Sequence, residues 1–104
     1  MRPSVFYPPM DEARRALARL FLRNGVIREP DRLRRAKEKS TYKKGYEVRL
    51  VAFTREELGQ IRGFLHRAGF PLAKPFAKSR RFVQPVYGRQ AVETFRALAR
   101  EIDR

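Results

Sequence analysis

Basic side chains are the residues of this sequence best suited to chemistry with a partner. The chain of 104 residues carries 25 Lys and Arg against 11 Asp and Glu, a formal net charge of +14 at pH 7. A surface this basic repels itself unless a polyanion neutralises it, and it is typical of nucleic-acid-binding proteins, with a general solubility bias as the alternative. The cations that we expect to contact nucleic acid are Arg28, Arg32, Arg34, Arg35, Lys43, Lys44, Arg49, Lys74, Lys78, Arg80 and Arg81.

Aromatic residues interleaved with these cations could add a second kind of contact. Lys74, Phe76 and Lys78 are expected on one face of a strand. Arginine and lysine bind phosphate or guanine edges, whereas exposed rings stack on unpaired bases. The alternative is that Phe76 and Phe82 belong to the core.

Residue types that catalysis needs are sparse. Cysteine is absent, which excludes disulfides, thiolate zinc sites and cysteine nucleophiles. His66, the one histidine, comes without a strained Gly-x-Ser-x-Gly turn and is interpreted as structural. The adjacent acids at 11–12 and 56–57 fit the first turns of helices, where the helix dipole favours negative charge. The sequence therefore predicts no cofactor and no metal site.

Apolar residues at helical spacing predict the helices that must position the basic side chains. These helices are expected over 11–24, 54–68 and 89–103. Asn24-Gly25 is typical of a left-handed cap that ends the first helix. Thr54 and Glu57 form a capping box at the start of the second, in which each side chain serves a free backbone amide.

Alternating residues predict the strands. In the strand over 46–53, Val48 and Leu50 are expected on a buried face and Arg49 on the opposite one. A hairpin is expected over 71–88 with its turn at 78–80, and Pro75 and Pro85 favour edge pairing or bulges because proline cannot donate to a central ladder. Residues 26–45 are expected to be extended and irregular, with a short helix from residue 31 or a strand and loop as alternatives.

The order of elements predicts a single α+β domain over residues 1–104. A small mixed or antiparallel sheet carries the helices on one face. Gly59 and Gly63 are expected to let the second helix pack closely against that sheet. No apolar run approaches the length of a membrane span, and the N-terminus lacks an apolar signal core, so a cytoplasmic location without a membrane partner is expected.

The end of the first helix resembles a degenerate LAGLIDADG motif, the helix that names a family of homing endonucleases. The motif residues are Leu17, Ala18, Arg19, Leu20, Arg23, Asn24 and Gly25, of which Leu17, Ala18, Leu20 and Gly25 match. The likeness extends over about residues 10–103 through the order of strand, helix, hairpin and helix. It implies a single family unit whose concave sheet lies in the major groove of DNA, with Arg49, Lys74 and Lys78 reaching the bases.

Three departures from the family pattern bear on activity. Arg19 and Arg23 occupy positions where family helices carry small residues and pack into a dimer, and buried arginines without partners would cost several kcal/mol. We therefore interpret both as turned to solvent or phosphate. Asn24 stands where the family has a carboxylate that binds a divalent cation, and a neutral amide is a poor magnesium ligand.

The function expected from the sequence is binding of nucleic acid without catalysis, with duplex DNA favoured over RNA. The chain is expected to act as a monomer or with a protein partner. Two alternatives stay open: an RNA- or ribosome-associated basic protein, and a divalent-metal nuclease subunit that acts with a partner.

Overall fold

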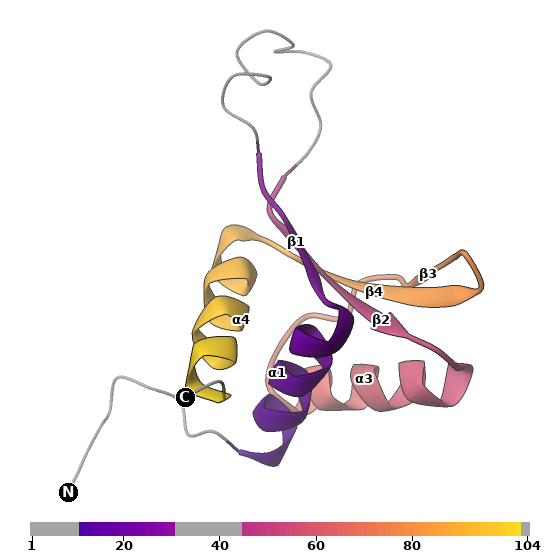
Figure 1. Ribbon diagram of the computed structural model, residues 1–104, viewed down its shortest axis with the longest axis horizontal. Coiled ribbons are helices and arrows are strands. Elements are labelled where there is room, and N and C mark those ends of the chain that lie inside the picture. The colour runs from indigo at the N-terminus through magenta and orange to yellow at the C-terminus, as the bar shows by residue number, and fades with distance from the viewer. Residues whose placement is uncertain (1–10, 31–44, 103–104) are drawn as a thin grey trace, which may run out of the picture.

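Three helices and four strands make up the part of the chain that the structure, a computed structural model, describes: residues 11–30 and 45–102. The strands form one antiparallel sheet in the order β1-β2-β4-β3 (Figure 1). The predicted α+β class is thereby confirmed. The elements in chain order are α1 (Glu12–Asn24), β1 (Val26–Arg28), β2 (Glu47–Ala52), α3 (Arg55–Arg67), β3 (Phe76–Lys78), β4 (Arg81–Tyr87) and α4 (Arg89–Ile102).

The described helices pack on one face of the sheet, as the sequence predicted (Figure 1). In β2 the residues Val48, Leu50 and Ala52 are fully buried while their strand neighbours are not. α1 contacts both α3 and α4, and its Leu17 joins Phe95 of α4 in the buried cluster. Burying a large apolar side chain stabilises a fold by about 1.5–3 kcal/mol. This cluster therefore fixes the helices on one face, and none of the described helices lies on the other face of the sheet.

The strand register shows which residues point away from the helices. Successive strand residues point to opposite faces, and paired residues share a face. Val48 pairs with Ile27 and Val86, so these lie on the helix face. We call the opposite side the open face. Its strand residues are Val26, Arg28, Glu47, Arg49, Val51, Phe76, Lys78, Arg81, Val83, Pro85 and Tyr87.

The end of α1 differs from the predicted left-handed cap. Gly25 has φ −67° and ψ 153°, an extended conformation that leads directly into β1. Its amide donates to the Phe21 carbonyl at 2.7 Å. A Cβ atom at Gly25 would lie 2.6 Å from that carbonyl oxygen and 2.8 Å from the Phe21 Cα. Glycine is therefore needed here for a close backbone approach rather than for a positive φ.

The second helix begins as predicted but packs differently. The Thr54 hydroxyl accepts from the Glu57 amide at 3.0 Å, while the Glu57 carboxylate accepts from the amide of Phe53, one residue before the cap. The prediction that Gly59 and Gly63 pack against the sheet is wrong. Both are exposed, and a Cβ at either would meet no atom within 4 Å, because the helix turns the face of Ile61 and Leu65 toward the sheet instead.

The β3–β4 hairpin turns at Ser79 and Arg80, within the predicted turn. Their φ angles are +49° and +65°, the combination that a two-residue type I′ turn requires. β4 pairs with β3 only as far as Val83, so Pro85 lies where β4 has β2 alone as its neighbour in the described residues. This agrees with the expected edge pairing. The prediction that Lys74 shares the strand face of Lys78 is wrong, because β3 begins at Phe76.

Residues 26–28 form a regular strand instead of the predicted irregular segment. β1 pairs with the outer edge of β2, and Ile27 packs against the buried cluster from there. The prediction for the following residues, 31–44, lies outside the described part of the chain. The final helix agrees with its predicted range and buries Val92, Phe95 and Leu98.

Candidate nucleic-acid interface

A shallow hollow of about 240 Å³ lies on the open face of the sheet, and all four strands contribute to it. Its apolar residues come from the paired positions of neighbouring strands, with Val51 opposite Val83. Val83 is 5% exposed and forms part of the floor, whereas Val26 at the rim is 49% exposed. The lining residues are Val26, Arg28, Arg49, Val51, Lys78 and Val83. Three cations that are far apart in the sequence are thus brought around one apolar floor.

Arg49 is held in place from two sides. Its Nε donates to the Glu47 carboxylate at 2.9 Å, and its guanidinium carbon lies 5.3 Å from the centre of the Phe76 ring. A guanidinium has five N–H donors, and within the described residues Arg49 uses its Nε–H alone for a hydrogen bond. Arg49 is therefore held in position, and its terminal N–H groups donate to no other described residue.

Basic residues in and just before the β3–β4 hairpin lack acidic partners in the described structure. Lys74, Lys78 and Arg80 are exposed, and the sequence from Leu58 to Val92 contains no Asp or Glu. Lys78 pairs with Arg81 in the strand register, so two positive charges stand side by side on the open face. Like charges on a cross-strand pair repel, and an external anion would relieve that repulsion.

Phe53 is a contact point between the hairpin and α1. The ring lies just beyond β2 and is 41% exposed. The Arg81 guanidinium carbon stands 4.6 Å from its centre and that of Arg23 stands 4.3 Å away, so both make cation–π contacts. The ring therefore connects Arg81 of β4 to Arg23 of α1.

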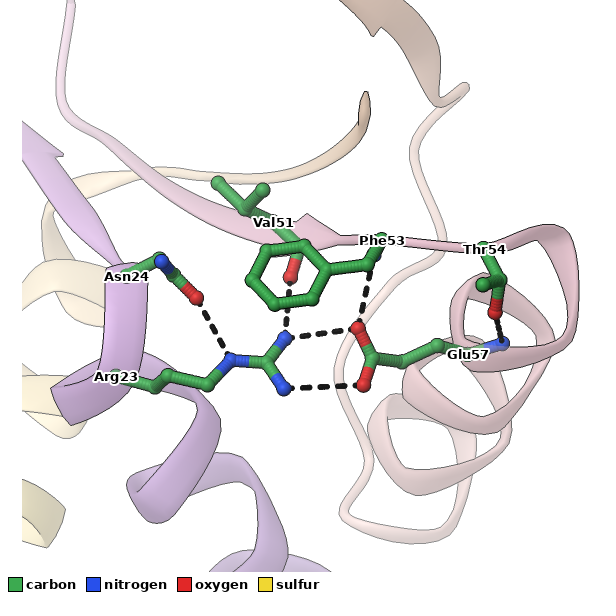
Figure 2. Close-up of polar contacts among 6 residues, drawn as sticks. All are labelled: Arg23, Asn24, Val51, Phe53, Thr54 and Glu57. Atoms are coloured by element: carbon green, nitrogen blue, oxygen red, sulfur yellow. Dashed lines mark hydrogen bonds and ion pairs between the residues drawn. The ribbon is translucent and has the colours of Figure 1, made fainter. Parts of the chain in front are cut away.

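Arg23, a residue of the degenerate motif, is engaged in a network that the sequence did not indicate. Its two terminal nitrogens donate to the Glu57 carboxylate at 3.0 and 2.8 Å, and one of them also donates to the Val51 carbonyl at 3.0 Å (Figure 2). The hydrogen bonds from Arg23 hold the pKa of the Glu57 carboxyl below its ordinary value, against an opposing effect of partial burial. The interpretation that Arg23 turns freely to solvent or phosphate is therefore wrong.

The other motif residues divide between core and surface. Leu17 and Ala18 are fully buried and Leu20 packs against the core. Arg19 is exposed, as expected, and makes no polar contact within residues 11–30 and 45–102. The Asn24 side-chain oxygen accepts from Arg23 Nε at 2.7 Å (Figure 2). The side-chain oxygen of Asn24 therefore already accepts one hydrogen bond, from its neighbour Arg23.

The structure brings together part of the predicted set of cations. Arg28, Arg49 and Lys78 line the hollow, and Arg81 lies beside Lys78. Lys74, which precedes β3, and Arg80 of the hairpin turn are exposed, but neither lines the hollow. The remaining predicted residues lie outside the described part of the chain: Arg32, Arg34, Arg35, Lys43 and Lys44.

Sequence reasoning missed the apolar members of the face. Val51 alternates with Leu50 and Ala52 and so shares a face with Arg49, which was a signal that this face is partly apolar. The contribution of Val26 and Val83 depends on strand pairing across the sheet, for which the sequence carried no comparable signal.

Comparisons with known proteins provide no evidence on function, so the proposal below is based on the geometry of the open face. No family model, no curated protein and no solved structure matches the chain. The likeness to LAGLIDADG proteins consequently stays a prediction. Within the described ranges, no three or more His, Asp or Glu side chains gather as metal ligands, and no helix there is long and apolar enough to cross a membrane.

Proposed function

We propose that this chain is a nucleic-acid-binding protein without catalytic activity, and that the open face of its sheet contacts duplex DNA. The observation that carries the proposal is the hollow in which Arg28, Arg49 and Lys78 from three strands surround an apolar floor. That combination suits base edges and phosphates together, since arginine and lysine bind guanine edges or phosphate and apolar groups contact the thymine methyl.

Charge supports a DNA ligand, and the open face offers it a continuous surface of four paired strands, because β2 pairs with β4 along its whole length. The net charge of +14 matches a polyanion. RNA is the competing ligand, and it is an outcome of the test below.

The absence of catalysis rests on the end of α1. Asn24 occupies the position where the resemblance implies a metal-binding carboxylate, and its side-chain oxygen accepts from Arg23. The Glu57 carboxylate, the acid nearest in this network, is bound by the same arginine. A divalent cation would have to displace a bidentate arginine to reach it. We expect a supercoiled plasmid to stay intact with the protein and magnesium or manganese, and metal-dependent nicking that is lost in Asn24→Ala would contradict this.

A matched pair of cation variants tests the location of the interface. Lys78→Ala removes a charge from the open face, and Arg100→Ala removes one from α4 on the helix side. Each phosphate contact contributes about −0.9 to the log–log salt slope. Lys78→Ala should flatten the slope for duplex DNA by about one contact, and Arg100→Ala should leave it unchanged.

Two results would contradict the proposed interface or ligand. Equal effects of the two substitutions would show that DNA is attracted by the overall charge and not bound at the open face. Tighter binding to a base-paired RNA of the same length and sequence would transfer the assignment to RNA.

A further inference from the structure

We infer that the hollow on the open face recognises the 5-methyl group of a pyrimidine in the major groove, so that the protein favours thymine over uracil and 5-methylcytosine over cytosine. This inference rests on the proposed function, because it needs duplex DNA against the open face. It adds a determinant of specificity that cations alone could not supply.

The floor and rim of the hollow are chemically suited to a methyl group. Val26, Val51 and Val83 carry aliphatic side chains without hydrogen-bonding atoms. Val26 leaves about half of its surface exposed, at 49%, and Val51 is partly exposed. Contact between two apolar groups removes both from water and so stabilises the complex. The pyrimidine 5-methyl is the apolar group that the major groove offers.

The size of the hollow fits the edge of a base. Pockets that enclose drug-sized ligands run from about 300 to 1,000 Å³. The hollow, at about 240 Å³, falls below that range. It has room for a base edge presented from a groove, and its rim positions Arg28, Arg49 and Lys78 for polar groups of neighbouring bases or phosphates.

The charges of the face disfavour unmethylated cytosine. In the major groove cytosine presents an amino donor, for which acidic side chains are the usual acceptors. Glu47 is the one acid among the described strand residues of the open face, and it accepts from Arg49 at 2.9 Å. An incoming cytosine amino group therefore meets cations and valines. Methylation at C5 adds an apolar contact with the valines, which partly offsets the lack of an acceptor for the cytosine amino group.

Two pairs of matched duplexes test the inference with the whole protein. One pair is an alternating dA-dT duplex and its dA-dU counterpart; the other is an alternating dG-dC duplex and the same duplex with 5-methylcytosine. Each pair differs in the methyl groups, and the two pairs differ in groove shape, so an effect of the same sign in both excludes a shape effect. Binding is measured by fluorescence anisotropy at one fixed salt concentration.

We expect the methylated member of each pair to bind about fourfold more tightly. That ratio corresponds to one methyl group removed from water, or ~0.8 kcal/mol. Val51→Thr keeps the branched shape of the side chain and places a hydroxyl in the hollow, so the ratio should fall toward one. Val26→Thr, at an exposed position, should have the same effect, and Leu72→Thr, outside the hollow, should keep the full ratio.

The outcomes separate this inference from the proposed function. Equal affinity for both members of each pair, with strong duplex binding, would overturn the methyl recognition and leave the DNA-binding proposal standing. A ratio that responds equally to Leu72→Thr and Val51→Thr would also overturn it. Absence of binding to all four duplexes would overturn both.

Discussion

At the scale of single residues, the ends of α1 show how short-range geometry constrains the sequence. Asp11 caps the helix start, where its carboxylate accepts from the Arg14 amide at 2.8 Å. At the other end the chain passes from helix to strand within one residue, Gly25, where a Cβ atom would clash with the Phe21 backbone. This sharp exit brings β1 back along β2 and so creates the edge that carries Val26 and Arg28.

A substitution of Gly25 tests this local account. Gly25→Ala places a methyl group within 2.6 Å of the Phe21 carbonyl oxygen, so part of α1 or β1 must shift. Overpacking of this kind costs about 1–3 kcal/mol of unfolding free energy. Gly63→Ala is the matched control: it lies within a helix in open space and should stabilise the protein by about 0.5–1 kcal/mol. Urea unfolding measures both, and equal effects would contradict the account.

At the scale of elements, polar contacts connect helix ends and a loop segment that lie outside the apolar core. Arg23 joins the end of α1 to the start of α3 through Glu57 and to β2 through the Val51 carbonyl (Figure 2). Arg62 of α3 and the buried Gln84 of β4 both donate to the Ala73 carbonyl, at 2.9 and 2.8 Å. These two hydrogen bonds to Ala73 fix the segment that leads into β3, and with it the position of Lys78.

Removing the carboxylate of Glu57 should weaken the link between α1 and α3. Glu57→Gln loses the bidentate pair with Arg23, and charged hydrogen bonds contribute about 1.5–3 kcal/mol when protected from water. Because the Arg23 and Glu57 side chains are 36% and 24% exposed, we expect a loss of about 1–2 kcal/mol. Glu93→Gln breaks the exposed pair with Arg89 on α4 and should cost less than about 0.5 kcal/mol. A smaller loss for Glu57→Gln than for Glu93→Gln in thermal or urea unfolding would refute the role given to this pair.

The same carboxylates predict how stability depends on pH. Hydrogen bonds from Arg23 lower the pKa of Glu57, those from Arg96 lower the pKa of Glu29, and the Arg14 amide lowers the pKa of Asp11. Acids with lowered pKa values stabilise the fold while they are ionised. Their contribution should be complete at neutral pH and lost progressively as the pH falls below about 4.5, the ordinary value of Glu57. Urea midpoints that stay constant from pH 6 down to about pH 3 would contradict this assignment.

The sequence predicted elements well and side-chain partnerships poorly, for a physical reason. The burial of Val48, Leu50 and Ala52 follows from a period of two within one strand, and the helices follow from their own apolar spacing. The Arg23–Glu57 pair joins residues 34 positions apart, and the hollow depends on the register of four strands. Such contacts are set by tertiary packing. Local sequence patterns therefore indicate which residues belong to the candidate site, but not that these residues lie close together.

At the scale of the whole molecule, the domain has a layered arrangement of charge. Helices cover one face of the sheet (Figure 1). The open face gathers Arg28, Arg49, Lys78 and Arg81. Most acids of the described chain are paired with arginines, as in the Arg23–Glu57 and Arg96–Glu29 pairs, so they do not offset the cations of the hairpin. We therefore expect the open face to have the most positive electrostatic potential of the described structure. We also expect it to be the face that contacts DNA.

The salt dependence of duplex binding tests the central claim most directly. Each neutralised phosphate releases condensed counterion, so about six contacts would give a log–log slope near −5. We predict this slope for the full chain on a duplex of two helical turns, measured by fluorescence anisotropy between about 50 and 200 mM salt. An affinity that does not change across that range would contradict the assignment of the open face as a nucleic-acid interface.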